Sequence, residues 1–190
     1  MKTTYLLSLL LLLSACTPQY LPVNKKIPYN TKPCKKALKK HSELRGMPID
    51  YIVVYKKQKK LKTFTKGKHR DTFRISLGKN ANKGHKVKQG DYRTPEGSYT
   101  IIRKKCDKRL YKSLLISYPN QKDRDNARKK GFDAGGYITI HGQPKWNADG
   151  RGDDHTLKSN WTEGCIAVSN SSMDNLWHGV SNGAKITIYP

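Results

Sequence analysis

From residue 49 onward the chain is divided into short runs of β-branched, aromatic and aliphatic residues, most of them ended by Gly, Pro or charged turn residues. Residues of these types favour the pleated, half-buried surface of a sheet, so each run predicts a strand. The runs cover residues 51–55, 61–65, 72–77, 99–103, 114–118, 137–140, 166–168 and 185–189. Their number and shortness predict a mostly β domain, a sandwich or barrel-like fold of about nine strands with two or three short helices.

Two segments carry helix signals instead. Pro33 suits the first turn of a helix, and the apolar residues among positions 34–41 fall on one face before Gly46. Towards the other end, Ser171 stands at a cap position with Asp174 three residues later, and apolar residues follow at helical spacing. We therefore expect one helix before the first strand and one after residue 168.

The first 16 residues read MKTTYLLSLLLLLSAC, a leucine-rich run too short to span a membrane with small residues directly before Cys16. This pattern is typical of a secretory signal peptide, here residues 1–15, that ends at a lipid-modified cysteine. An uncleaved anchor is the alternative. By resemblance to Gram-negative lipoproteins, Thr17 in place of aspartate favours the outer membrane over the inner. We expect a periplasmic, lipid-anchored protein.

The chain carries a formal net charge of +24, which predicts anionic partners. Nucleic acid is the usual partner of such charge, but export argues against it and leaves an anionic membrane surface and the carboxylate-bearing polymer of the cell wall. Residues 16–46 read as a basic, proline-containing tether, and residues 17–46 hold eight basic side chains and one acidic side chain. The tether either binds an anionic surface or stays solvated through its charge.

The strongest sign of chemistry lies at the ends of two predicted strands. Residues 137–140 run directly into His141 and Gly142, and Gly164 directly precedes Cys165. If the two strands are neighbours, an imidazole lies beside a thiol, as acyl transfer through a thiolate requires. The long polar loop between them is typical of a functional segment. In the alternative, both residues are structural, since a cysteine in an apolar strand often acts as a small buried hydrophobe.

Glycine at position 164 has a physical role in the catalytic interpretation. Because it lacks a Cβ, Gly164 allows a substrate carbonyl to approach the Cys165 backbone closely. The consecutive N–H groups of Gly164 and Cys165 are then candidates for holding the oxyanion of a tetrahedral intermediate.

These elements resemble the L,D-transpeptidase catalytic domain (YkuD) family, whose pattern is a strand ending in Ile-His-Gly and, after a loop, Ser/Thr-His-Gly-Cys-Ile. Here the two motifs read Ile140-His141-Gly142 and Thr162-Glu163-Gly164-Cys165-Ile166. Glu163 replaces the family's second histidine, and Ala167 replaces the usual arginine. The run WTEGCIAVSN is most similar to the YafK-type branch, and the segment GDYRTPEGSY matches the family's TPxG-x-Y pattern.

The resemblance covers about residues 47–190 and implies a β-sandwich or barrel-like catalytic domain that acts on peptidoglycan stem peptides. It implies that Cys165 attacks the carbonyl of the third stem residue and that His141 handles the proton. The expected catalytic set is Cys165, His141, Gly164, Gly142 and Thr162, and the expected substrate contacts are Glu163, Arg93 and Trp161.

The nucleophile that attacks the cysteine thioester determines whether the enzyme is a transferase or a hydrolase. An amine acceptor gives an L,D-transpeptidase. Water gives a hydrolase of the same family, either an L,D-carboxypeptidase or an amidase that detaches a peptidoglycan-linked lipoprotein. A non-catalytic wall-binding lipoprotein is a further alternative, and Glu163 in place of histidine is its best argument.

The two remaining cysteines, Cys34 and Cys106, are expected to form a disulfide, because export takes the chain to an oxidising compartment. Two unpaired buried thiols are the alternative. The acidic and histidine side chains at positions 153–155 are neighbours in one loop and do not make a metal site by themselves. We expect a monomer without metal or cofactor.

Overall fold

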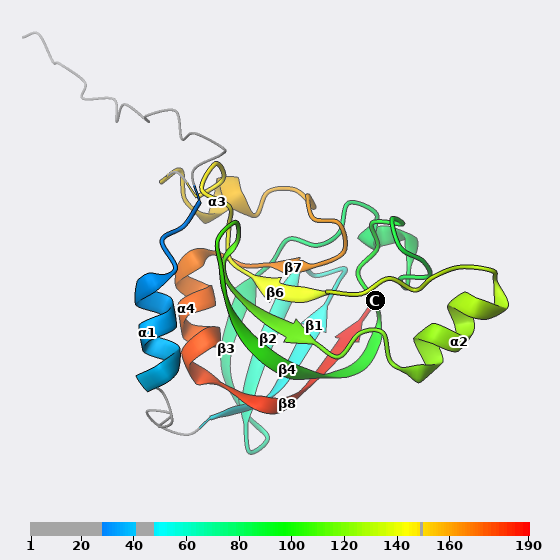
Figure 1. Cartoon of the computed structure of the whole chain (residues 1–190), viewed down its shortest axis with the longest axis horizontal. Coiled ribbons are helices and arrows are strands. Elements are labelled where there is room, and N and C mark those ends of the chain that lie inside the picture. Colours follow the sequence, from blue (N-terminus) through cyan, green and yellow to red (C-terminus); the bar gives the residue numbers. More distant parts are fainter. Residues whose placement is uncertain (1–27, 41–47, 149) are drawn as a thin grey trace, which may run out of the picture.

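The computed structural model describes residues 28–40, 48–148 and 150–190. The predicted signal peptide, the lipidation site Cys16 and most of the tether lie outside these residues. The described elements, shown in Figure 1, are α1 (Lys32–Lys40), β1 (Ile49–Tyr55), β2 (Lys60–Thr65), β3 (Lys68–Arg74), the 3-10 helix η1 (Ala81–Lys83), β4 (Gly97–Asp107), β5 (Tyr111–Ile116), α2 (Gln121–Lys129), β6 (Thr139–His141), α3 (Asp153–Thr156), β7 (Ile166–Ala167), α4 (Asn170–Gly179) and β8 (Val180–Tyr189). None of the described helices is long and apolar enough to cross a membrane.

The described strands form one curled sheet of eight strands in the order β3-β2-β1-β8-β4-β5-β6-β7 (Figure 1). Strands β1 and β8 pair in parallel near the middle of the sheet, and β6 and β7 pair in parallel at one edge. The remaining neighbours are antiparallel. The predicted mostly β fold with short helices is confirmed, and its strands belong to a single sheet.

The core is centred on the parallel pair of strands β1 and β8. Ile52 faces Ile186 and Val54 faces Ile188 across this pair, and all four side chains are buried. Parallel strands are usually covered on both faces, which explains why β1 reads as a nearly continuous apolar run. Trp177 of α4 is 1% exposed and packs in the same core. Full burial of such side chains stabilises the fold by about 1.5–3 kcal/mol each.

Helix α2 was not predicted, although its start carries a signal. The Asn120 side chain accepts a hydrogen bond from the Asp123 N–H at 3.0 Å, and the Asp123 carboxylate accepts one from the Asn120 N–H at 2.9 Å. This reciprocal cap satisfies two backbone donors that a helix start leaves unpaired. Asn followed three residues later by Asp, directly after Pro119, is the signal that sequence reasoning overlooked.

Strand β3 lies earlier in the chain than expected. It was predicted at residues 72–77, but it ends at Arg74. Ser76 instead forms an isolated bridge with Ala167, which lies next to β6 in the sheet. The segment after β3 therefore leaves the hairpin and packs beside the predicted cysteine strand.

Helix α4 was predicted with Ser171 at its cap, but it begins two residues earlier. Ser169 is the cap residue, because its hydroxyl oxygen accepts a hydrogen bond from the Ser172 N–H at 3.1 Å. The helix thus starts directly after the apolar run that contains β7. This short connection fixes α4 close to the site described below.

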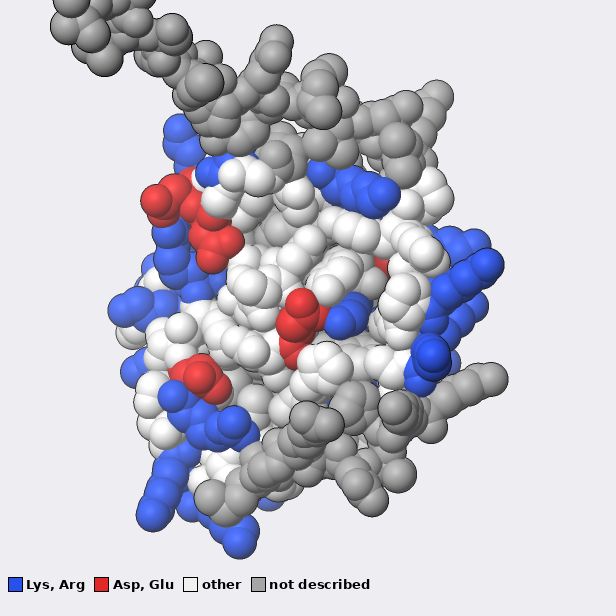
Figure 2. All heavy atoms as spheres, turned by 90° about the vertical axis from the view of Figure 1, so that its left-hand side faces the viewer, with Lys and Arg blue, Asp and Glu red and all other residues white. Residues whose placement is uncertain are grey.

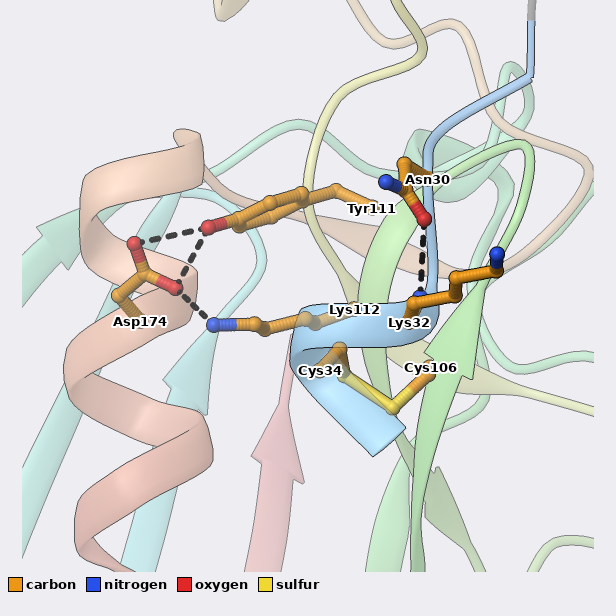
Figure 3. The surroundings of a disulfide bond; sticks show 7 residues. All are labelled: Asn30, Lys32, Cys34, Cys106, Tyr111, Lys112 and Asp174. Atoms are coloured by element: carbon orange, nitrogen blue, oxygen red, sulfur yellow. Dashed lines mark hydrogen bonds and ion pairs between the residues drawn. A yellow bond between two sulfur atoms is a disulfide. The ribbon is translucent and has the colours of Figure 1, made fainter. Parts of the chain in front are cut away.

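Helix α1 is attached to the sheet by a disulfide. Cys34 and Cys106 of β4 are joined with an S–S distance of 2.12 Å (Figure 3). Just before the helix, the Tyr29 N–H donates a hydrogen bond to the Lys108 carbonyl at 2.7 Å. Residues 28–40 therefore pack against the sheet, although they precede the expected start of the catalytic domain at residue 47.

Candidate active site

Strands β6 and β7 bring the predicted histidine and cysteine together. Their parallel pairing places His141 opposite Ala167 and Ile140 opposite Ile166. Cys165 lies one residue before β7, and its sulfur accepts a hydrogen bond from the Thr139 N–H at 3.4 Å. The imidazole is 1% exposed, whereas the thiol is partly exposed. The site therefore combines a buried imidazole with a partly exposed cysteine.

The surroundings of Cys165 favour its thiolate. The Thr139 hydroxyl lies 3.6 Å from the sulfur as a second donor. The neutral thiol can itself donate to the Tyr137 carbonyl at 3.7 Å, a contact that does not stabilise the thiolate. Burial alone would raise the pKa of the Cys165 thiol, but the hydrogen bond and positive charge of His141, with the two donors of Thr139, outweigh burial and lower this pKa. A thiol with a lowered pKa is a stronger nucleophile near neutral pH.

A backbone carbonyl orients the His141 ring. Its Nδ1 atom lies 2.7 Å from the Gly142 oxygen. A carbonyl oxygen only accepts hydrogen bonds, so Nδ1 carries the hydrogen and Nε2 is the atom left to exchange a proton with the thiol. The Trp161 ring lies edge-on to the imidazole, with 5.6 Å between ring centroids. The imidazole is thus held by a hydrogen bond at one nitrogen and by packing against an indole.

Thr162 holds the turn that leads to the nucleophile. Its hydroxyl donates to the Cys165 carbonyl at 2.7 Å and accepts from the Gly164 N–H at 3.2 Å. The Gly164 N–H, expected to bind an oxyanion, is therefore engaged within the turn. Thr162 contacts the backbone of the nucleophile and has no hydrogen bond to the thiol among the described residues. Its contribution is to the geometry of the turn.

Gly164 is a position at which only glycine fits. Its backbone has φ +133°, and a Cβ atom would lie 2.8 Å from the Arg93 carbonyl oxygen. Both the conformation and the close approach exclude a side chain. The glycine predicted to admit a substrate carbonyl thus also admits the neighbouring loop of the protein itself.

The other predicted site residues lie around the Cys165–His141 pair in different ways. Trp161 is half-buried between the His141 ring and the Trp146 ring, whose centroid is 5.8 Å away. The Glu163 side chain is exposed to solvent. The Arg93 guanidinium donates to the His85 carbonyl at 3.3 Å, so its side chain is committed to its own loop.

The loop that carries Arg93 is held by a buried ion pair. Lys86 and Asp91 lie 2.8 Å apart, with side chains 4% and 8% exposed. Burial alone would raise the pKa of Asp91, but hydrogen bonds from Lys86 and from the N–H groups of Arg93, Val87 and Lys88 lower it to about 2. This loop packs directly on the turn that precedes the nucleophile.

Sequence reasoning missed two residues that contact the sulfur. Thr139 lies two positions before His141 on β6, and the period of two along a strand places both side chains on one face. The spacing of two residues from His141 could therefore have identified Thr139 from the sequence. Tyr137 contributes its carbonyl from a backbone with φ +56°, and its side chain is 82% exposed. A left-handed conformation at a tyrosine has no signature in the sequence.

Two comparisons relate this chain to known sequences. The model of the L,D-transpeptidase catalytic domain (YkuD) family matches residues 49–188. The Escherichia coli K12 protein named "Putative L,D-transpeptidase YafK" is 29% identical over 174 residues, which cover 85% of this chain and 61% of that protein. The chain therefore spans less than two thirds of the length of that relative.

Solved structures show a similar fold. The helical cell shape determining protein Pgp2 of Campylobacter jejuni is 26% identical with a TM-score of 0.55, and the match covers 75% of this chain and 48% of that chain. Bd1075 of Bdellovibrio bacteriovorus is 20% identical with a TM-score of 0.52, covering 75% of this chain and 48% of that chain. The second likeness concerns the fold alone.

Proposed function

Because the chain belongs to the L,D-transpeptidase catalytic domain (YkuD) family, we propose that it is a cysteine peptidoglycan L,D-transpeptidase acting on the third residue of stem peptides. The observation that carries this proposal is the partly exposed Cys165 thiol with a lowered pKa beside the buried His141. A structural cysteine has no need of a thiolate-stabilising environment, whereas an acyl-transfer nucleophile does.

In this proposal the Cys165 thiolate attacks the carbonyl carbon of the third stem residue. The S–C bond forms and the carbonyl oxygen becomes an oxyanion, which accepts a hydrogen bond from the Cys165 N–H. His141, protonated at Nε2, gives its proton to the departing amine as the C–N bond breaks. An acceptor amine then attacks the thioester, His141 removes its proton, and the thiolate leaves as the new amide forms.

Side chains around the pair support these steps. Thr139 stabilises the thiolate before attack through its two donors. Gly142 keeps His141 in the tautomer that leaves Nε2 available. Trp161, next to the imidazole, forms one wall for the substrate, and the exposed Glu163 contacts an amine of the substrate or acceptor.

Hydrolysis is the second candidate function, because Cys165 is partly exposed and water can reach a thioester formed there. The product is then that of an L,D-carboxypeptidase, or of an amidase that detaches a peptidoglycan-linked lipoprotein. Both candidates share the same acylation step, and they differ only in the nucleophile that resolves the thioester.

The setting that we propose is the periplasmic side of a membrane, with lipid on Cys16. The charge of +24 suits anionic membrane surfaces and cell-wall carboxylates. On the face in Figure 2, Lys and Arg side chains gather in groups at the sides, and the largely uncharged centre holds an acidic group directly beside a basic one. If lipidation is real, Cys16→Ala should leave a longer, unprocessed precursor in the membrane fraction, and normal processing of that variant would contradict it.

The test is to incubate purified sacculi with the protein in water enriched in ¹⁸O and to identify the muropeptides by mass spectrometry. Transfer yields joined peptides without ¹⁸O at the new bond. Hydrolysis yields a new carboxylate that contains ¹⁸O. Recovery of unchanged muropeptides after incubation with folded protein would contradict both candidates.

A further inference from the structure

Tyr29 connects the N-terminal segment to the backbone beside the catalytic histidine, although it lies outside the residues that match the family. Its hydroxyl donates to the Gln143 carbonyl at 2.9 Å and accepts from the Asn170 side-chain amide at 3.2 Å. The Gln143 N–H donates to the Asn170 side-chain oxygen at 2.8 Å. These three hydrogen bonds link the N–H and the carbonyl of Gln143, the Asn170 side chain and the Tyr29 hydroxyl in a closed ring.

The same stretch of backbone orients the imidazole. Gly142, between His141 and Gln143, accepts the hydrogen bond of the His141 Nδ1 atom and donates its N–H to the Lys112 carbonyl at 3.1 Å. A Cβ atom on Gly142 would lie 2.5 Å from the Asn170 side-chain oxygen, so the packing here leaves little free space. A shift of the Gln143 peptide would therefore move the carbonyl that holds the ring.

Tyr29 is itself held in place on several sides. Its ring lies 5.3 Å from the Tyr111 ring, and the Tyr111 hydroxyl donates to Asp174 at 2.9 Å (Figure 3). The Lys145 ammonium lies 5.5 Å from the Tyr29 ring centroid. Burial raises the pKa of Tyr29 despite its hydrogen bond with Asn170, so the hydroxyl stays a donor at neutral pH.

The disulfide secures this segment a few residues further on. Cys34 in α1 is joined to Cys106 of β4, and the chain between Tyr29 and Cys34 is too short to move far while that bond is intact. A covalent link restricts the alternative positions of the chain next to it. Without the disulfide, Tyr29 would be retained by non-covalent contacts alone.

We propose that Tyr29 is a positioning residue for His141 and that the Cys34–Cys106 disulfide keeps Tyr29 in position. The reactivity of the Cys165 thiol then depends on whether that disulfide is oxidised. The turnover part of this inference rests on the proposed function. The thiol part does not, because it concerns the coupling of His141 to Cys165 and needs no substrate.

The first test compares Tyr29→Phe with Tyr51→Phe in the full chain. Tyr51 is the control, because its hydroxyl also takes part in a partly buried hydrogen bond, to Thr187 at 3.1 Å, whereas the Tyr29 hydroxyl takes part in two. The rate at which iodoacetamide labels Cys165 is measured at a series of pH values, by mass spectrometry of the peptide that carries this residue. The labelling midpoint is the pH at which this rate reaches half of its maximum. We expect Tyr29→Phe to move the labelling midpoint to higher pH and to lower kcat on soluble muropeptides about two- to tenfold with KM unchanged, since both hydrogen bonds of the Tyr29 hydroxyl are lost.

The outcomes distinguish a role of Tyr29 in positioning His141 from a role in the stability of the fold alone. A raised midpoint for Tyr29→Phe, with wild-type behaviour of Tyr51→Phe, supports the proposal. Tyr29→Phe with the same midpoint as Tyr51→Phe overturns it, even if thermal stability and turnover fall together, because the role is then structural only. If the wild type turns over no muropeptide, the proposed function fails while the labelling midpoints still decide this inference.

The second test removes the disulfide with the paired change Cys34→Ser and Cys106→Ser. We expect the labelling midpoint to shift in the same direction as in Tyr29→Phe. Adding Tyr29→Phe to the pair should then produce little further shift, because coupled residues do not act additively. A wild-type midpoint in the paired variant, or fully additive shifts, would show that the disulfide does not act through Tyr29.

Discussion

One threonine supplies two donors to the sulfur of Cys165, and these donors, together with His141, lower the pKa of the thiol. The strand backbone presents the Thr139 N–H, and the side chain adds the hydroxyl. Hydrogen bonds to a charged form stabilise that form and so lower the pKa of an acid. The lowered pKa of Cys165 therefore depends in part on a residue that carries no obvious chemical signature.

The lowered pKa of Cys165 predicts the pH dependence of its labelling. The thiolate is the reactive form, so the rate should rise with pH and level off at a midpoint below that of an ordinary cysteine. Thr139→Val removes the hydroxyl but keeps the N–H, and it should move the midpoint upward by less than His141→Ala does. Thr100→Val on β4 is the control. A midpoint at or above the ordinary cysteine value in the wild type would contradict this account.

Gly164→Ala should damage both folding and activity, because it combines an unfavourable φ of +133° with a Cβ atom 2.8 Å from the Arg93 carbonyl. Gly183 offers a matched control with φ +82° and no atom within 4 Å of its Cβ position. Chemical denaturation should show a loss of about 1 kcal/mol for Gly183→Ala and about 3 kcal/mol for Gly164→Ala. Equal losses would mean that the close contact with Arg93 can relax.

At the residue scale the sequence indicated two candidate reactive groups but not the residues that contact them. His141 and Cys165 stand out because unusual residue types end apolar strands. The use of the Gly164 N–H within the turn could not be foreseen, since it depends on the rotamer of Thr162. The hydrogen bonds of Tyr29 join residues 114 and 141 positions apart, which no local pattern reveals.

At the scale of the elements, the loop between η1 and β4 packs against the turn that precedes Cys165. Its Lys86–Asp91 ion pair is buried, and its backbone packs on Gly164. A buried carboxylate with several donors stabilises the fold only while it is ionised. The loop should therefore loosen in acid before the sheet does.

Asp91→Asn tests this loop. The folded-state pKa of Asp91 is about 2, below its value of 3.8 in a model compound, so its stabilisation of about 2 kcal/mol is present above pH 4 and is lost as the pH falls towards 2. At neutral pH the variant should be less stable than the wild type by at least this amount, with the difference shrinking in acid. Asp153→Asn, which changes an exposed acidic residue, is the control. A difference that does not vary with pH would contradict the role of Asp91.

The strands were more predictable than the helices and the boundaries. The apolar run of β1 reports burial directly, because both faces of this strand are covered. The second half of β8 instead alternates buried and more exposed residues, which is also a strand signal. The start of β3 was misplaced because its exposed residues, such as Arg70 and Arg74, give an edge strand a polar sequence. Helix α2 has a strongly polar composition, and its cap is the main sign of its presence.

At the scale of the whole molecule, the site is assembled from segments far apart in the chain. Strand β6, the turn before β7 and the Asp91 loop meet at Cys165, and residues 28–40 are fastened to the sheet by the Cys34–Cys106 disulfide. The sequence predicted the mostly β fold and the neighbouring strands that bring Cys165 and His141 together. The chemistry of the pair stays a prediction. The expected Cys34–Cys106 disulfide joins α1 to β4. The contacts of Tyr29 with Gln143 and Asn170 were not predicted, because they join residues that are far apart in the chain.

The most direct test of the central claim is the rate at which Cys165→Ala releases or joins stem peptides from purified sacculi. Circular dichroism and thermal unfolding should first show that the variant is folded. We expect wild-type protein to convert the third-residue bond and Cys165→Ala to form no product above background, because the variant lacks the atom that becomes acylated. A folded Cys165→Ala protein that forms product at the wild-type rate would contradict the account.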